Sequence, residues 1–71
     1  MQKHLVTSSA FNQVAYDKEN KVLFIYFKHS PIYSFKEVPE DFFKEFINAK
    51  SKGSFYHNRI KGKFLESRLD N

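Results

Sequence analysis

The stretch from Val22 to Pro39 constrains the fold of this chain more than any other. It contains two short apolar runs, Val22–Phe27 and Ile32–Phe35, separated by Lys28-His29-Ser30-Pro31. β-branched and aromatic residues dominate both runs and turn formers fill the gap, so the stretch predicts a β-hairpin. Pro39 then ends the second strand, because proline lacks the N–H that a strand ladder needs.

The length of the hairpin turn decides which aromatic residues are buried, because a one-residue slip reverses the faces of a strand. A three-residue turn, with Ser30 at the position that glycine suits best, gives an inner face made of Leu23, Ile25, Phe27, Tyr33 and Phe35. A two- or four-residue turn instead pairs Phe24 and Tyr26 with Tyr33 and Phe35. We prefer the three-residue turn, which leaves Phe24 and Tyr26 on the outer face.

The flanking segments predict one more strand and two helices. An imperfect apolar pattern over Phe11–Tyr16 indicates a strand, followed by a polar turn. Pro39 to about Lys50 has a broad apolar helical face, and Gly53 is expected to cap that helix at its C-terminus. A shorter helix is expected over Ser54–Lys61 and ends at Gly62.

The expected fold is therefore α+β: a three-stranded antiparallel β-meander with one face covered by a helix, plus a short second helix. All 71 residues form a single domain with a core over about residues 8–64. The first residues of Met1–Thr7 are expected to be loosely held, and Phe64 and Leu65 to pack back onto the core. Glu66–Asn71 is expected to be a flexible tail.

Composition and motifs argue against several classes of function. The chain has no cysteine, which excludes disulfides and thiolate-held zinc and is typical of intracellular proteins. No apolar run approaches the ~20 residues of a membrane span, and the N-terminus does not resemble a signal peptide. The histidines are widely separated, Ser8-Ser9 lacks a nucleophile motif, and Glu40-Asp41 suit a helix start. We expect a cytoplasmic protein without catalytic activity, metal, cofactor or membrane partner.

The net charge of +4 arises from one part of the chain, Lys50–Lys63, which we call the basic segment. These fourteen residues contain no acid, whereas the rest of the chain has seven basic and eight acidic residues. Such a cluster indicates a polyanionic partner. The candidate nucleic-acid-binding residues are Lys50, Lys52, Arg59, Lys61 and Lys63.

Part of this charge has a structural explanation. Lys50 and Lys52 are expected at the end of the first helix and Lys61 at the end of the second, where cations complement the helix dipole. Arg59 and Lys63 have no such role in the expected fold. Ser51–Ser54 would also present N–H groups at a helix start, where a phosphate can bind.

Several short motifs follow one another between Tyr33 and Phe64. The series is Tyr33-Ser34-Phe35, Val38-Pro39, Ala49-x-Ser51-x-Gly53, Phe55-Tyr56, Ile60-Lys61 and Phe64. In this order, from about Ser8 to Phe64, the chain resembles the KTSC domain, a small domain found at the C-terminus of some lysyl-tRNA synthetases and as a standalone protein. The resemblance implies the three-residue turn and an inner position for Tyr33 and Phe35.

The sequence departs from that family at three places. Phe35 replaces a second tyrosine, Ser30 stands where the family tends to have a turn glycine, and His57 stands where asparagine is common. The resemblance suggests RNA binding but no defined chemistry. Tyr33 and Phe35 are interpreted as core residues in preference to a base-stacking platform, because so small a chain needs large apolar side chains for its core.

We therefore expect a small non-catalytic binding module that binds RNA, either tRNA or a single strand, through the basic segment. The alternative is a protein-protein interaction or oligomerisation module that uses the apolar outer sheet face around Phe24 and Tyr26. Phosphate contacts lose affinity steeply with salt, whereas an apolar interface does not.

Overall fold

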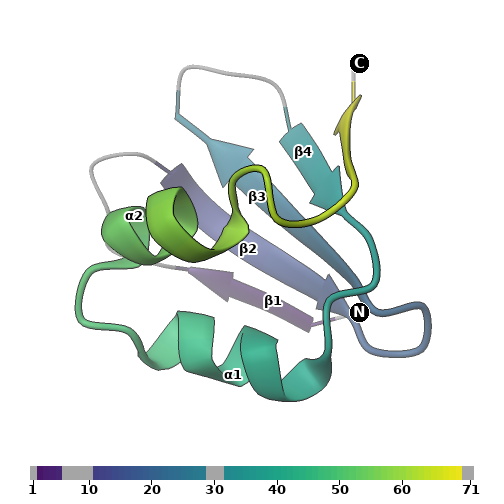
Figure 1. The fold of residues 1–71 in the computed structure, drawn as a ribbon, viewed down its shortest axis with the longest axis horizontal. Helices are drawn as coiled ribbons and strands as arrows, with labels where there is room; N and C mark the ends of the chain where they lie inside the picture. The colour runs from purple at the N-terminus through teal and green to yellow at the C-terminus, as the bar shows by residue number, and fades with distance from the viewer. Residues whose placement is uncertain (1, 6–10, 29–31, 70–71) are drawn as a thin grey trace.

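The sheet of this protein has five strands, all antiparallel, in the order β1-β2-β3-β4-β5. The structure is a computed structural model that describes residues 2–5, 11–28 and 32–69, with the backbone alone for residues 2–5. The strands are β1 (Gln2–Leu5), β2 (Phe11–Asp17), β3 (Val22–Phe27), β4 (Ile32–Phe35) and β5 (Glu66–Leu69). Three helical elements lie on one side of this sheet (Figure 1). They are α1 (Glu40–Asn48), α2 (Lys52–Phe55) and a single π-helical turn, η1 (Tyr56–Ile60).

The α+β class and the central β2-β3-β4 meander are confirmed, but the expected count of three strands is wrong. β1 adds to one edge through the pair Lys3↔Ala15, and β5 adds to the other through Ser34↔Ser67. The flexible tail expected over Glu66–Asn71 is therefore wrong for Glu66–Leu69, and the loosely held start is wrong for residues 2–5. Strand β5 is exposed along its whole length, so backbone pairing with β4 places it there rather than burial of its side chains.

The expected register of the hairpin is confirmed. Leu23 lies opposite Phe35, and Ile25 lies opposite Tyr33. Phe24 lies opposite Ser34 and therefore shares the outer face with it. The turn that sets this register, including Ser30, lies outside the described residues, as do Ser8 and Ser9.

Helix α1 begins directly after Pro39, and its first turn contains Glu40 and Asp41 as expected. It ends at Asn48, where the N–H of Ala49 donates to the Phe46 carbonyl at 3.2 Å. The prediction that Gly53 caps this helix is wrong, because α2 has already begun at Lys52. The Ser51 side chain caps α2 and so fixes that earlier start.

The core lies between the inner face of the sheet and the helical layer. Tyr16 stacks on Phe43 with ring centroids 4.5 Å apart, and its hydroxyl donates a hydrogen bond of 2.5 Å to the Val38 carbonyl. Burial raises the pKa of Tyr16, with Glu40 and Asp17 adding to the shift, so the hydroxyl stays protonated. The fully buried residues are Phe11, Val14, Ala15, Leu23, Ile25, Phe35, Val38, Phe46 and Ile60.

The chain after η1 differs from its expected packing at one residue. Gly62 ends the second helix as expected and adopts the left-handed conformation, with a φ of 75°. Phe64 then packs against Phe42, with ring centroids 5.1 Å apart. Leu65 does not pack back, because 69% of its surface is exposed.

Replacing Phe46 by alanine should remove the centre of the α1 core face. Phe46 is fully buried and contacts the rings of Phe11 and Phe55. We expect a loss of ~3–5 kcal/mol in the free energy of unfolding, measured by chemical denaturation, because a large cavity remains. The control is Lys44→Ala on the exposed side of the same helix, expected to change stability by no more than ~0.5 kcal/mol. Equal midpoints for the two variants would contradict this description of α1.

Replacing Tyr16 by phenylalanine should keep the ring stacked on Phe43 while deleting its hydroxyl. The Val38 carbonyl then loses its partner inside the core, which should cost ~1–3 kcal/mol of unfolding free energy. Tyr26→Phe removes the same atom from the outer sheet face, where the side chain is half-buried, and should cost less than ~0.5 kcal/mol. A Tyr16→Phe protein as stable as the parent would mean that this hydrogen bond does not support the fold.

Candidate nucleic-acid interface in the basic segment

Two helix-capping devices shape the basic segment. At its start, the Ser51 hydroxyl accepts the N–H of Ser54 at 3.3 Å, and the Ser51 carbonyl accepts the N–H of Phe55 at 3.0 Å. At its end, the N–H of Lys61 donates to the Tyr56 carbonyl at 2.8 Å, which closes the wide π turn. A helix does begin at this point, as the suggested phosphate site at Ser51–Ser54 requires, but the Ser51 side chain already occupies the N–H of Ser54.

Lys52 has a structural contact within this segment. Its Nζ donates a 2.9 Å hydrogen bond to the carbonyl of Ala49, the residue that follows α1. The side chain is partly buried by this contact. The expected stabilising role of Lys52 at the end of the first helix is thus confirmed, and its ammonium group is less available to a ligand.

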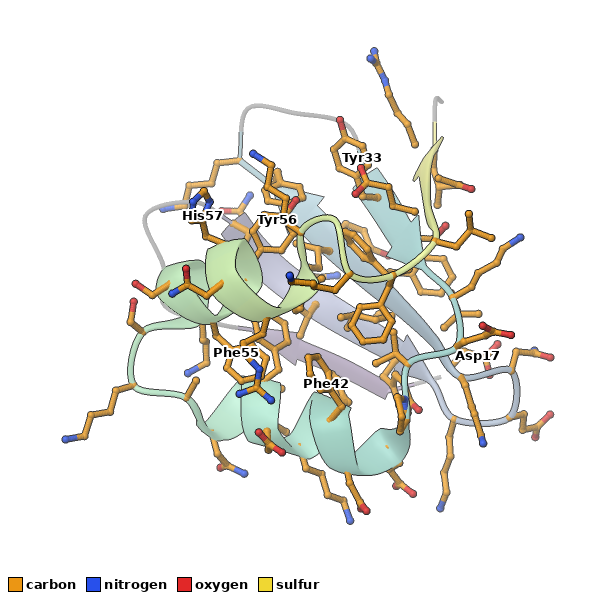
Figure 2. All side chains as sticks on the ribbon, viewed as in Figure 1. Asp17, Tyr33, Phe42, Phe55, Tyr56 and His57 are labelled. Atoms are coloured by element: carbon orange, nitrogen blue, oxygen red, sulfur yellow. The ribbon has the colours of Figure 1, made fainter. Side chains whose placement is uncertain are left out.

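The expectation that Arg59 lacks a structural role is wrong. Its guanidinium carbon lies 5.4 Å from the centroid of the Phe42 ring and 5.1 Å from that of Phe55. Figure 2 labels these two rings, whose centroids lie 5.3 Å apart with the ring planes tilted by 56°. One guanidinium nitrogen also lies 3.5 Å from a carboxylate oxygen of Glu45. Arg59 therefore links the two helical elements while about half of its side chain remains exposed.

Lys50, Lys61 and Lys63 differ from those two cations. All three are exposed. In the described part of the chain, the ion pairs are Lys18 with Glu40 and Arg59 with Glu45, and these three lysines belong to neither pair. Lys50 precedes α2, whereas Lys61 and Lys63 follow η1. The nine helical residues between them span about 13 Å at 1.5 Å per residue. The lysines thus stand at the two ends of one short helical unit.

Aromatic rings border the same unit at the edge of the core. Phe27 makes edge-to-face contacts with Tyr33 at 5.6 Å and with Tyr56 at 5.2 Å between ring centroids. Tyr33 is half-buried, so it contributes to packing as expected. Burial raises the pKa of Tyr56, and Glu66 and Tyr33 add to the shift, so its hydroxyl can donate a hydrogen bond at neutral pH. Figure 2 places Tyr33, Tyr56 and His57 toward the same end of the molecule.

The other candidate residues, Phe24 and Tyr26, lie on the opposite face of the sheet. Both are half-buried, and the neighbouring Ala15 and Ser34 are buried. The helical unit of the basic segment packs against the inner face through Ile60. The structure therefore does not bring the two sets of candidate residues together. The role of Arg59 was missed in the sequence because its three partners come from two different helices.

The described residues give no sign of a metal centre or a membrane span. No group of three or more His, Cys, Asp or Glu side chains in that part of the chain gathers as a metal site. None of its helices has the length and apolar character needed to cross a membrane. The candidate interface is thus a charged surface without a metal cluster in the described part of the chain.

Comparisons with known proteins identify the family. No curated protein matches the chain. The crystal structure of a KTSC domain protein from Yersinia pestis superimposes on it with a TM-score of 0.93 and 38% sequence identity, covering 97% of each chain. The sequence model of the KTSC domain matches residues 7–64, close to the expected limits. The chain therefore belongs to the KTSC domain family.

Proposed function

We propose that this protein is a small non-catalytic module that binds RNA weakly and with little sequence preference. The contacts are phosphate contacts from Lys50, Lys61 and Lys63. The observation that supports this choice is that these three cations are exposed and take part in neither ion pair of the described residues.

The structure narrows the set of contacts that the sequence suggested. Lys52 already donates to Ala49, and Arg59 already contacts Glu45, Phe42 and Phe55. Moving either cation to a phosphate would weaken a contact that holds the helical layer together. Three phosphate contacts are therefore the working number. Each phosphate contact to a single strand contributes about −0.7 to the slope of log affinity against log salt concentration, so three contacts should give a slope near −2.

RNA is preferred over other polyanions because of the family resemblance. KTSC domains occur at the C-terminus of some lysyl-tRNA synthetases, which handle tRNA. The half-buried aromatic rings of Tyr33 and Tyr56 lie at the edge of the core. At such a position an unpaired base can stack on a ring or accept a hydrogen bond from a tyrosine hydroxyl. Backbone contacts position a nucleic acid but do not read its sequence.

A protein partner is the second candidate, and the outer face of the sheet favours it. Phe24 and Tyr26 are half-buried on a face that none of the described helices covers (Figure 1). Their cross-strand neighbours, Ser34 and Ile32, are uncharged. An apolar contact on this face would show little dependence on salt, in contrast to phosphate binding.

Titration of the protein into labelled tRNA and into a single-stranded RNA at low salt tests the proposal. We expect weak binding to both, with a salt slope near −2 on the single strand. Binding that persists unchanged as salt is raised would exclude the phosphate mechanism. Absence of binding to both RNAs at high protein concentration would exclude RNA as the partner and leave the protein candidate.

The double variant Lys61→Gln, Lys63→Gln should lose most RNA binding and keep the stability of the parent, because both side chains are exposed. The matched control is Lys18→Gln, Lys44→Gln, which removes the same charge from exposed positions outside the basic segment. If both double variants bind equally, net charge rather than the basic segment drives binding.

Arg59→Gln serves a different purpose. We expect it to lower the free energy of unfolding by ~1 kcal/mol, because the variant loses an exposed stacking contact and an exposed ion pair. Thermal unfolding of Arg59→Gln beside Lys61→Gln measures the difference. If the two variants have the same free energy of unfolding, the contacts of Arg59 do not stabilise the fold and Arg59 is also a candidate for RNA binding.

A further inference from the structure

The edge formed by β5 exposes apolar side chains that the core does not use. Leu65 is 69% exposed and Leu69 is 38% exposed, and these are the exposed large apolar residues of the described chain. β5 pairs with β4 on one side, and the structure describes no strand on its other side. An open strand edge can pair with another strand through its backbone.

The backbone alternation of β5 shows which residues face that edge. The Leu65 carbonyl accepts the N–H of Lys36 at 3.0 Å, so Leu65 directs its backbone toward the β4 side. In an antiparallel pair, hydrogen-bonded positions alternate along the strand. Ser67 and Leu69 therefore also direct their backbone groups toward β4, whereas Glu66 and Arg68 direct theirs toward the outer edge.

We propose that β5 pairs antiparallel with β5 of a second copy of this chain, about a two-fold axis at Ser67. The two five-stranded sheets then join into one continuous sheet. A two-fold contact of this kind places the same surface of each copy against itself. The side chains that it uses differ from Lys50, Lys61 and Lys63, the residues proposed to contact phosphates.

The charges on β5 select this register. Pairing through the outer edge allows Glu66 opposite Glu66, Arg68 opposite Arg68, or Glu66 opposite Arg68 of the second copy. The first two arrangements place like charges directly opposite, which is unfavourable. In the third arrangement, Glu66 of each copy lies opposite Arg68 of the other copy, so the two-fold axis produces two pairs of opposite charge. Arg68 also makes a contact within its own chain, and a guanidinium with five N–H donors can serve both partners.

The same register matches the exposed leucines. With Ser67 opposite Ser67 of the second copy, Leu65 lies opposite Leu69 of that copy, again twice. These leucines project on the outer face, the side to which Ile32 contributes through its pairing with Leu69. Dimerisation would therefore extend an apolar row across the junction. The shortness of β5, with four residues, predicts a weak dimer smaller than a standard protein interface.

Sedimentation equilibrium up to ~1 mM protein, where a contact worth about 4 kcal/mol is half-populated, tests this dimer. Glu66→Arg and Arg68→Glu should each weaken dimerisation about tenfold, because each creates two like-charged pairs. The double variant Glu66→Arg, Arg68→Glu and an equimolar mixture of the two single variants should both dimerise like the parent. If dimerisation is restored neither in the double variant nor in the mixture, the proposed register is wrong.

Amide NMR of the parent protein gives a second measurement that needs no variant. On dilution, the expected chemical-shift changes concentrate at Glu66 and Arg68. Changes centred on Phe24 and Tyr26 instead would place self-association on the outer sheet face and overturn the proposal. A parent that remains monomeric up to ~1 mM overturns it as well. Lys61→Gln should leave dimerisation unchanged whatever its effect on RNA.

Discussion

The fold depends on the contact of Tyr16 with the segment that joins the sheet to α1. The ring stacks on Phe43 of α1, and the hydroxyl donates to the carbonyl of Val38 just before the helix. The N–H of Val38 in turn donates to the carbonyl of Lys21 at 2.9 Å. Both backbone polar groups of a fully buried residue are thus satisfied. This arrangement holds α1 beneath the meander.

Contacts between aromatic side chains stabilise this small domain, whereas other small domains use disulfides or a metal. Phe55 connects the helical elements, because its ring contacts both Phe42 and Phe46 of α1. Arg59 extends this aromatic group by stacking on Phe42 and Phe55. A positively charged residue in the sequence is therefore not always an unpaired charge on the surface, as Arg59 shows. Only the cations outside such contacts remain available to a polyanion.

The two faces and the open edge of the sheet offer different chemistry. The inner face is covered by the helical layer, the outer face presents half-buried Phe24 and Tyr26, and the β5 edge presents Leu65 and Leu69. The basic segment belongs to the helical layer. The proposed phosphate contacts and the proposed β5 pairing use different side chains, so substitutions can test each proposal by itself.

The sequence by itself determined the β2-β3-β4 meander and the buried face of α1, whereas the register was the preferred one of two alternatives and was supported by the family resemblance. These features follow from local patterns: the apolar run before Phe27, the turn, and Pro39 before a helical repeat. It did not determine β1 or β5, because Gln2–Leu5 and Glu66–Leu69 lack an apolar pattern and join the sheet through backbone hydrogen bonds. The role of Arg59 was likewise decided by tertiary structure, because its partners lie on α1 and α2. Residue type shows that a side chain is charged, but only the fold shows whether that charge is already paired.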